Sequence, residues 1–252
     1  MDGNEFIKNS HIQVKVINRS FYGSLIEYAS AVPTSRINIR RNYFEQNYHI
    51  GQDLTLVDID GGIIEITDNV MIDNGYLSLK SIAGNPQSVP LNATESFPYS
   101  SFNYQNASES GIFTFYFMTG DIPAGYSHYI ARNKFSHIFC LYGCAYTVKS
   151  ITIQQFYFEE NEYDYLFSFE GGTAYSGKLI NLKPNSKTPF IAMFKNEVMK
   201  NQIGTAIDIK NINDAGFIII ESCIFYNNYS SHGASIRMEK GGALIALNNH
   251  FS

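Results

Sequence analysis

The chain repeats one order of apolar and polar positions along most of its length. In segment 37–47, Ile37 and Ile39 are followed by an asparagine at the fifth offset, Phe44 at the seventh and Asn47 at the tenth. Copies of this frame begin, without gaps, at residues 14, 37, 64, 128, 151, 191, 218 and 244. Most steps between copies are 23 to 27 residues long, a period typical of solenoids built from stacked coils.

Asparagine recurs at two offsets of this frame. The fifth-offset asparagines are Asn42, Asn69, Asn133, Asn196 and Asn249, and the tenth-offset asparagines are Asn47, Asn74, Asn161, Asn201 and Asn228. Because stacked coils bring equivalent residues together, the pattern predicts ladders of amides that bond from coil to coil. The preference of Asn for turns explains the same positions without a ladder. Both interpretations place the asparagines at corners, in a structural role.

Glycine marks a second kind of corner, because a Gly or Gly-Gly repeatedly precedes a segment of alternating apolar residues. The glycines concerned are Gly61, Gly62, Gly171, Gly172, Gly204, Gly233, Gly241 and Gly242. Glycine allows the positive φ that a tight corner between two strands needs. The alternating segments that follow predict strands with one face inward and the other toward solvent.

These patterns predict an all-β fold, a right-handed parallel β-helix that forms a single domain over residues 1–252. Two loop insertions are expected, near 80–127 and 171–190, where the rhythm of the frame breaks. Within the first insertion, GIFTFYFM at 111–118 is apolar on both faces and is expected to return as a covered strand. Neither end shows a capping segment, so we expect a fragment of a longer chain, or ends covered by partner subunits.

The repeat also predicts which residues stack. Apolar residues at offsets zero, two and seven should be buried and aligned between neighbouring coils. Ile37 is then expected to lie over Ile64, and Ile191 over Ile218.

Two short motifs carry a resemblance to known repeats. Phe-x-x-Asn occurs at 44–47, 158–161 and 225–228, and Gly-Gly-Ala-Leu occurs at 241–244. The pair resembles the FxxN and GGA(I/L) repeats of polymorphic outer-membrane-type adhesins and of large pectin-lyase-like surface proteins of microbial eukaryotes. The resemblance implies a pectin-lyase-like parallel β-helix at a cell surface.

Composition narrows the possible partners. Charged residues make up only 16% of the chain, and the net charge is −5, which argues against a nucleic-acid partner because phosphate binding needs clustered Lys and Arg. No run of 18 apolar residues exists, so no transmembrane segment is expected, and the chain shows no signal peptide at its start. Three cysteines, Cys140, Cys144 and Cys223, are too few for a disulfide framework, and no ligand spacing predicts a metal or another cofactor.

The alternative of a carbohydrate-active enzyme depends on Asp208, His232 and Glu239. The segment from Ser231 to Ile236 looks like the His-Gly strand of pectin hydrolases, which place three aspartates on neighbouring coils near it. In this chain Gly204 and Thr205 stand where paired acids are expected, and a glycosidase needs two positioned carboxylates.

A polysaccharide lyase would instead need an acid cluster that binds Ca²⁺ and a basic residue. The densest acidic run is Asp53, Asp58, Asp60 and Glu65, with Arg40 and Arg41 on the preceding segment. Solvated loop acids explain that run equally well, so no catalytic residue is assigned.

We therefore expect a non-enzymatic structural or adhesive β-helix of an extracellular or cell-surface protein, with assembly into filaments as one form of the structural role. Its expected partners are neighbouring β-helix segments or like subunits, with glycans or surface proteins as further possibilities. Four sequons, at Asn18, Asn92, Asn106 and Asn228, permit N-glycosylation in a secreted protein.

Overall fold

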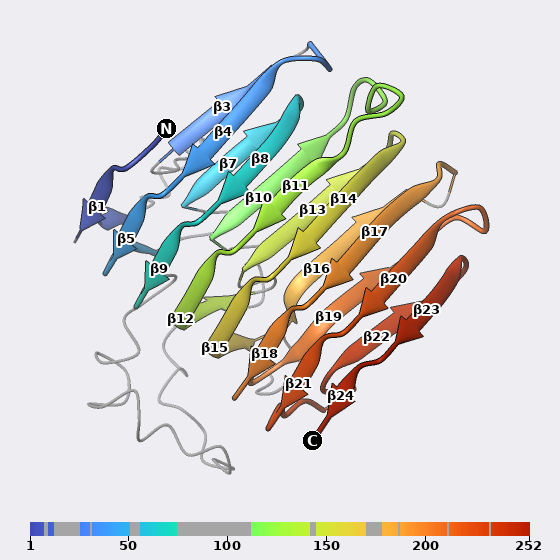
Figure 1. Cartoon of the computed structure of the whole chain (residues 1–252). Helices are drawn as coiled ribbons and strands as arrows, with labels where there is room; N and C mark the ends of the chain where they lie inside the picture. Colours follow the sequence, from blue (N-terminus) through green and yellow to red (C-terminus); the bar gives the residue numbers. More distant parts are fainter. Residues whose placement is uncertain are drawn as a thin grey trace, which may run out of the picture.

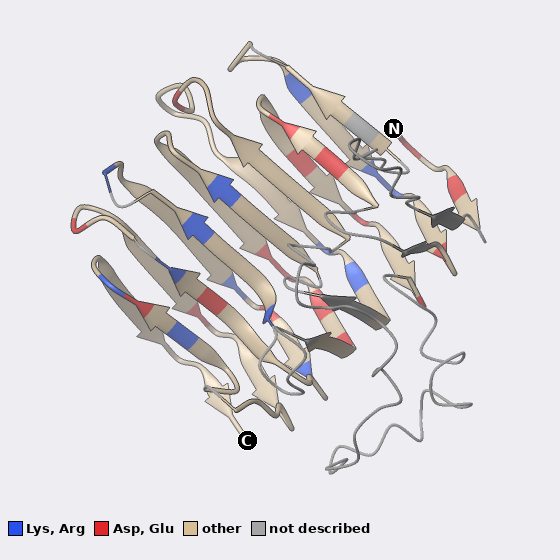
Figure 2. Cartoon of the chain, turned by 180° about the vertical axis from the view of Figure 1, so that it is seen from behind, with Lys and Arg blue, Asp and Glu red and all other residues tan. Residues whose placement is uncertain are grey.

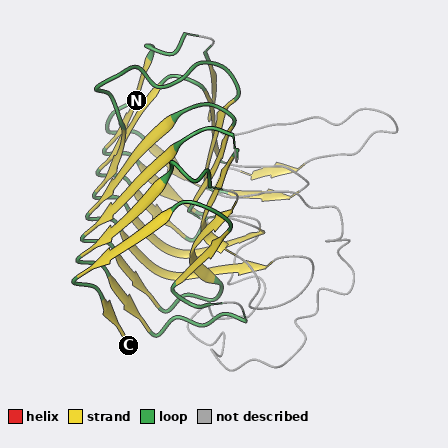
Figure 3. Cartoon of the chain, turned by 90° about the vertical axis from the view of Figure 1, so that its right-hand side faces the viewer, coloured by secondary structure: helices red, strands yellow, loops and turns green. Residues whose placement is uncertain are grey.

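A computed structural model describes residues 1–7, 10–12, 26–30, 32–50, 56–74, 112–141, 145–169, 178–185, 187–210, 212–231 and 233–252. Throughout these residues the chain forms strands and loops, without a helix (Figure 3). The strands lie side by side in long ribbons that run from the N-terminus to the C-terminus of the stack (Figure 1).

Three parallel sheets make up the solenoid. The strands of each sheet are named in the order in which they stack. Sheet 1 contains β3 (Ile26–Ala29), β7 (Val57–Asp60), β10 (Phe113–Phe117), β13 (Tyr146–Ser150), β16 (Lys178–Pro184), β19 (Thr205–Lys210) and β22 (Ile236–Glu239). Sheet 2 contains β4 (Arg36–Arg40), β8 (Ile63–Thr67), β11 (His128–Ala131), β14 (Gln154–Glu159), β17 (Phe190–Lys195), β20 (Phe217–Glu221) and β23 (Ala243–Leu247). Sheet 3 contains β1 (Glu5–Ile7), β5 (Tyr43–Glu45), β9 (Val70–Ile72), β12 (Lys134–Leu141), β15 (Glu162–Phe169), β18 (Val198–Lys200), β21 (Ile224–Tyr226) and β24 (His250–Phe251). A further parallel pair joins β2 (Ser10–Ile12) to β6 (Tyr48–Ile50).

The chain visits the three sheets in turn, and each strand pairs with its equivalent one coil later. This is the right-handed parallel β-helix that the repeat predicts. The interior is a column of apolar side chains contributed by all three sheets. No single coil can bury its own inner face, so each depends on its neighbours for stability.

The register confirms part of the predicted stacking and corrects the rest. Ile37 pairs with Ile64, as predicted. The prediction that Ile191 lies over Ile218 is wrong, because Ala192 pairs with Ile218 and Ile191 pairs with Phe217 on the outer face. Buried and half-buried residues alternate along β17, with Ala192 and Phe194 inside.

The copy of the frame placed at residue 151 is also wrong. Ile151 and Ile153 are exposed, whereas Phe156 and Phe158 are fully buried and pair with the preceding coil at His128 and Ile130. The aligned copies in the described chain therefore begin at 37, 64, 128, 156, 192, 218 and 244, with steps of 27, 64, 28, 36, 26 and 26 residues. Regular coils are thus 26 to 28 residues long rather than 23 to 27, and the copy placed at residue 14 lies outside the described residues.

Part of each expected insertion is core strand. The segment predicted as a covered strand is β10, whose side chains are buried on both faces. The prediction that residues 171–190 leave the coil is wrong for 178–184, because β16 pairs with β13 and β19 within sheet 1. The run KPNSK at 183–187 suggests a loop, but β16 extends into it as far as Pro184 and most of this strand is buried.

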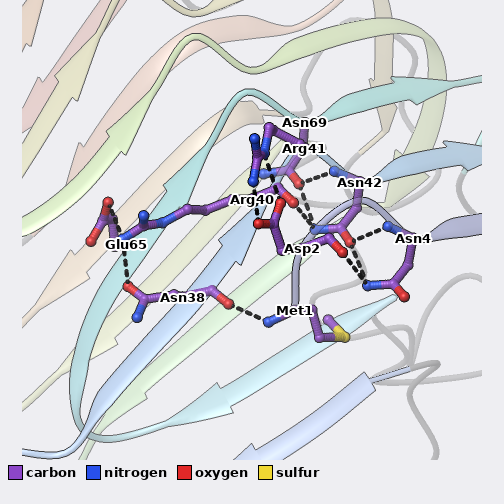
Figure 4. Close-up of polar contacts among 9 residues, drawn as sticks. All are labelled: Met1, Asp2, Asn4, Asn38, Arg40, Arg41, Asn42, Glu65 and Asn69. Atoms are coloured by element: carbon purple, nitrogen blue, oxygen red, sulfur yellow. Dashed lines mark hydrogen bonds and ion pairs between the residues drawn. The ribbon is translucent and has the colours of Figure 1, made fainter.

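An amide ladder joins the coils at the corner between sheets 2 and 3. Asn42 donates from its backbone N and its Nδ2 to Oδ1 of Asn69, both at 2.9 Å. Asn69 makes the same two bonds to Asn133, and Asn133 makes them to Asn161. Asn4, which the repeat analysis overlooked, starts the series by donating to Oδ1 of Asn42 (Figure 4). The amides thus bind one coil to the next without a gap.

Two residues without an amide continue this ladder toward the C-terminus. Glu197 accepts from the backbone N and Nδ2 of Asn161, and Cys223 donates from its backbone N to Oδ1 of Asn249. Asn196 does not lie in the ladder, contrary to the prediction. It precedes Glu197 at a corner position with φ of 53°. Asn tolerates this left-handed backbone conformation, so the same residue type occurs at the corner and in the ladder.

A second ladder lies at the next corner and is interrupted. Asn47 donates from its backbone N and its Nδ2 to Oδ1 of Asn74, and the backbone N of Gln202 donates to Oδ1 of Asn228. Between these pairs, buried Ile138 and Leu166 are aligned. Two predicted members of this ladder lie elsewhere: Asn161 belongs to the first ladder, and Asn201 occupies a left-handed corner.

Glycine is required at the corner between β7 and β8. Gly61 and Gly62 both have positive φ, of 81° and 79°. A Cβ on Gly61 would lie 2.3 Å from the carbonyl oxygen of Ser30 on the preceding coil, closer than any real contact. The corner therefore needs glycine for space as well as for conformation.

Replacing Phe225 tests the assignment of the core. Phe225 is 1% exposed and its ring stacks on Phe251 with centroids 5.0 Å apart, so Phe225→Ala should lower the free energy of unfolding by roughly 3–5 kcal/mol. Tyr226→Ala, at the neighbouring position that is 53% exposed, should cost less than about 1 kcal/mol. Urea unfolding of both variants measures the difference, and equal losses would contradict the assignment.

Candidate functional site

The two described acids of the enzyme alternative, Asp208 and Glu239, lie on the outer face of sheet 1. There, one polar residue from each of six strands stands in register: Asp58, Thr114, Thr147, Asn181, Asp208 and Arg237. Their neighbours along each strand point into the apolar interior, and strand alternation turns this column outward. We call these six residues the sheet 1 column.

Asp208 lies at the charged end of this column, within a cluster of cations. It is fully buried, and Nε of Arg237 donates to its Oδ1 at 2.6 Å. Nζ of Lys178, itself 1% exposed, lies 3.5 Å from its Oδ2. A buried carboxylate is tolerated only when it is paired, and here two cations pair with it.

Glu239, the other candidate acid, is turned toward cations as well. Its carboxylate lies 3.0 Å from Nη2 of Arg237 and 3.8 Å from Nζ of Lys210. The register sets Lys210 opposite Glu239 and Arg237 opposite Asp208, so the two acids do not face one another. His232, the third member of the enzyme alternative, lies outside the described residues.

The middle of the column is neutral and buried. Thr114, Thr147 and Asn181 are at most 1% exposed. The Oγ1 atoms of both threonines and both amide atoms of Asn181 complete no hydrogen bond. These atoms are polar but carry no charge and no acidic proton, so they offer no acid–base chemistry near neutral pH.

Beside the sheet 1 column runs a second outward row that contains three successive lysines between two acids. In register it contains Asp60, Tyr116, Lys149, Lys183, Lys210 and Glu239, and Figure 2 shows the basic and acidic segments of this sheet. Nζ of Lys149 lies 4.8 Å from the ring centroid of Tyr116, a cation–π contact. Burial lowers the pKa of Lys210, and the nearby Lys178 lowers it further.

The structure separates the residues of the lyase alternative. Asp58 and Asp60 lie on β7 of sheet 1, whereas Glu65 lies on β8 of sheet 2. Arg40 forms an ion pair with Glu65 at 2.8 Å, and Arg41 pairs with Asp2 (Figure 4). Asp53 lies outside the described residues. The acids that are described form no common cation site with a nearby base.

His128 is a buried histidine with no access to a substrate. Its ring is fully buried and packs between Phe117 and Phe156. Nδ1 accepts from the backbone N of Ile64, so Nε2 carries the proton that is shared with Oε1 of Gln154 at 2.7 Å. Burial lowers the pKa of His128 to about 4, which keeps it neutral as a core residue.

Cysteines and acidic residues give no metal centre in the part of the chain that the structure describes. No group of three His, Cys, Asp or Glu side chains comes together there. Cys223 is a free, buried thiol, and burial raises its pKa to about 12. The side chain of Cys140 and all of Cys144 lie outside the described residues, as does any pairing between them. The same residues contain no helix long and apolar enough to cross a membrane.

Of the four sequons, the structure describes only Asn228. Its Nδ2 donates to the carbonyl oxygen of Met199 at 2.9 Å, and its Oδ1 accepts from Gln202. A glycan on Nδ2 would remove this bond from the second ladder. Asn18, Asn92 and Asn106 lie outside the described residues.

Comparison with known proteins adds no relative, because no family model, no curated protein and no solved structure matches the chain.

Sequence reasoning missed both cations that pair with Asp208. Lys178 was assigned to an insertion, and nothing in the local sequence aligns it with a residue 30 positions later. Arg237 could have been found, because the alternating strands 205–210 and 235–239 follow equivalent glycines and place Asp208 and Arg237 at equivalent positions.

Removing the charge of Asp208 tests whether the ion cluster is structural. Asp208→Asn leaves the buried ammonium of Lys178 without its carboxylate, so we expect a loss of roughly 3–5 kcal/mol in the free energy of unfolding. The double variant Lys178→Met with Asp208→Asn should recover part of that loss. Glu239→Gln, at a 47% exposed carboxylate, should cost less than about 1 kcal/mol. Chemical melts measure all three, and a loss below about 1 kcal/mol for Asp208→Asn would refute the pairing.

Proposed function

We propose that this chain is a non-enzymatic structural or adhesive β-helix of an extracellular or cell-surface protein. The observation that carries the proposal is the pairing of Asp208 with Lys178 and Arg237 beneath the surface of sheet 1. The residue best placed for acid chemistry is thereby used to neutralise buried cations.

Glycoside hydrolysis needs one carboxyl group that holds a proton and a second that acts as base or nucleophile, at a defined separation across the substrate. Both oxygens of Asp208 face cations, Arg237 and Lys178, rather than a substrate. Asp208 is fully buried, so a substrate oxygen cannot reach it. Glu239 faces Arg237 and Lys210 instead of a second acid.

The adhesive part of the proposal is supported by the outer face of sheet 2. Five successive strands present Tyr129, Tyr157, Met193, Ile219 and Ile245 in register. Four of them are half-buried and Ile245 is 42% exposed. Ile191 and Phe217 stand beside them. We name these seven residues the sheet 2 apolar face.

A flat apolar sheet face fits the flat face of another sheet, because two such faces pack about 10 Å apart with their side chains interdigitated. The proposed partner is therefore a neighbouring β-helix segment or a like subunit. The resemblance of the Phe-x-x-Asn and Gly-Gly-Ala-Leu motifs to surface adhesins agrees with this choice. Glycosylation at Asn18, Asn92 and Asn106 remains part of the extracellular proposal, with glycans or surface proteins as further partners.

One experiment with two arms tests this function on the purified chain. In the first arm, polygalacturonate, other uronates and neutral glycans are incubated with the protein, with and without Ca²⁺, and no turnover is expected. In the second arm, sedimentation velocity follows self-association with concentration. Ile219→Lys should weaken association at least tenfold, because it places a charge in the centre of the sheet 2 apolar face. Glu239→Gln, on sheet 1, should leave it unchanged.

Each arm has a result that would contradict the part of the proposal that it tests. Turnover that disappears with Asp208→Asn or His232→Ala would replace the proposal with the enzyme alternative. A monomer at every concentration, or association that Ile219→Lys does not affect, would remove the like subunit as the partner of this face.

A further inference from the structure

Glu197 occupies a position of the first ladder at which an amide stands in the preceding coils. Its Oε1 accepts from the backbone N of Asn161 at 3.2 Å and from Nδ2 of Asn161 at 2.9 Å. These are the two bonds that Oδ1 of Asn161 accepts from Asn133 one coil earlier. One oxygen of Glu197 therefore reproduces the acceptor half of the amide.

The other half of the amide is a donor, which an ionised carboxylate cannot supply. Nδ2 of Asn69, Asn133 and Asn161 donates to a carbonyl oxygen of the preceding coil, at 2.9 to 3.0 Å. Cys223 donates in the same direction, because its Sγ–H points to the carbonyl oxygen of Phe194 on the preceding coil, with Sγ 3.5 Å from that oxygen. Only the protonated form of Glu197 carries a hydrogen of this kind, although Oε2 makes no hydrogen bond in this arrangement.

The surroundings of Glu197 also disfavour a negative charge. Its side chain is fully buried, and no ion pair with Lys or Arg is found for it among the residues that the structure describes. Against this, the hydroxyl of Tyr163, on β15, interacts with Glu197 and lowers its pKa, and Tyr146 on β13 adjoins Tyr163. Both hydroxyls and Oε2 of Glu197 nevertheless complete no hydrogen bond of ordinary geometry.

The remaining titratable groups around the joint include Cys223, before β21, two acids at strand ends, and Lys195, which ends β17 in register between those acids. Glu159 ends β14 and acts on Glu197, and Glu221 ends β20 and acts on Cys223. Burial of Glu197 is the largest cause of its raised pKa, about 8. The hydrogen bonds from Asn161 and Tyr163 lower the pKa, and Glu159 raises it.

We propose that Glu197 is held as the neutral acid in the ladder and makes the joint between the coils that begin at 156 and 192 sensitive to pH. Loss of its proton places a charge in the core between Asn161, Tyr163 and Cys223. A buried charge without a cation destabilises this joint, although Oε1 still accepts from Asn161, and the coils on its C-terminal side depend on that joint for stability.

The sign of the pH dependence follows from proton binding. The folded chain holds the proton of Glu197 up to about pH 8, whereas an unfolded chain releases it near pH 4.5. The stabilisation is complete below pH 4.5 and is lost as the pH rises to about 8. His128 acts in the opposite direction, since its pKa is lowered from 6.5 to about 4, and its stabilisation is complete above pH 6.5. Between pH 6.5 and 8, Glu197 therefore acts without opposition from His128.

The test measures urea unfolding of the whole chain at pH 6.5 and pH 8. Because the unfolded chain lacks the proton of Glu197 across this interval and the folded chain half-loses it by pH 8, the folding equilibrium should weaken roughly 15-fold in the unmodified chain. Glu197→Gln, which supplies a neutral amide of the same length, should reduce that change to less than about twofold. His128→Gln is the matched control and should keep the full change.

Hydrogen exchange on the unmodified chain provides a second measurement that does not depend on the variants folding. The backbone N–H of Asn161, bonded to Oε1 of Glu197, should exchange faster between pH 6.5 and 8 than base catalysis alone explains. The backbone N–H of Asn42, bonded to Asn69, should follow base catalysis. The proposal is overturned if the unmodified chain shows no loss of stability in this interval, if Glu197→Gln keeps the full change, or if the two N–H groups respond alike.

Discussion

Register between coils is the constraint on which this solenoid depends, and the first asparagine ladder is the interaction that fixes it. Each amide accepts two bonds at one oxygen and donates from its nitrogen to the preceding coil. A shift of one residue would break these bonds and also turn the apolar face of every strand outward. Hydrophobic burial supplies most of the stabilisation, but it is non-directional. The ladder adds the direction, because its donors and acceptors meet in one alignment only.

The fold could be predicted because the apolar spacing at offsets zero, two and seven is visible in the sequence. Ile37 and Ile64 align as that spacing requires. The frame failed where Asn196 and Asn201 mark left-handed corners one residue before Glu197 and Gln202. The same residue type suits both positions, so sequence alone did not distinguish the corner from the ladder.

The candidate site was harder to predict for a different reason. Asp208 is one of the three residues of the enzyme alternative, but its chemistry depends on Lys178 and Arg237, which reach it from neighbouring strands. That contact can be recognised only once the register of sheet 1 is known. In addition, the short run of charged and proline residues that follows Lys178 resembles a loop. In the same way, the neutral state proposed for Glu197 depends on its burial and not on its neighbours in sequence. Asp208 is buried against cations, and Glu197 is buried without them. The two acids therefore differ in charge state in this account, but both act within the fold and neither acts on a substrate.

The central claim, that the first ladder fixes the register, is tested most directly by comparing Asn133→Ala with Asn196→Gly in urea unfolding. Asn133 bonds to Asn69, Ile66 and Asn161 from a fully buried position, so its loss leaves several buried polar groups unpaired. We expect Asn133→Ala to cost at least about 3 kcal/mol in the free energy of unfolding. Asn196→Gly, at a left-handed corner outside the ladder, should stay within about 0.5 kcal/mol. Equal effects of the two substitutions would contradict the claim.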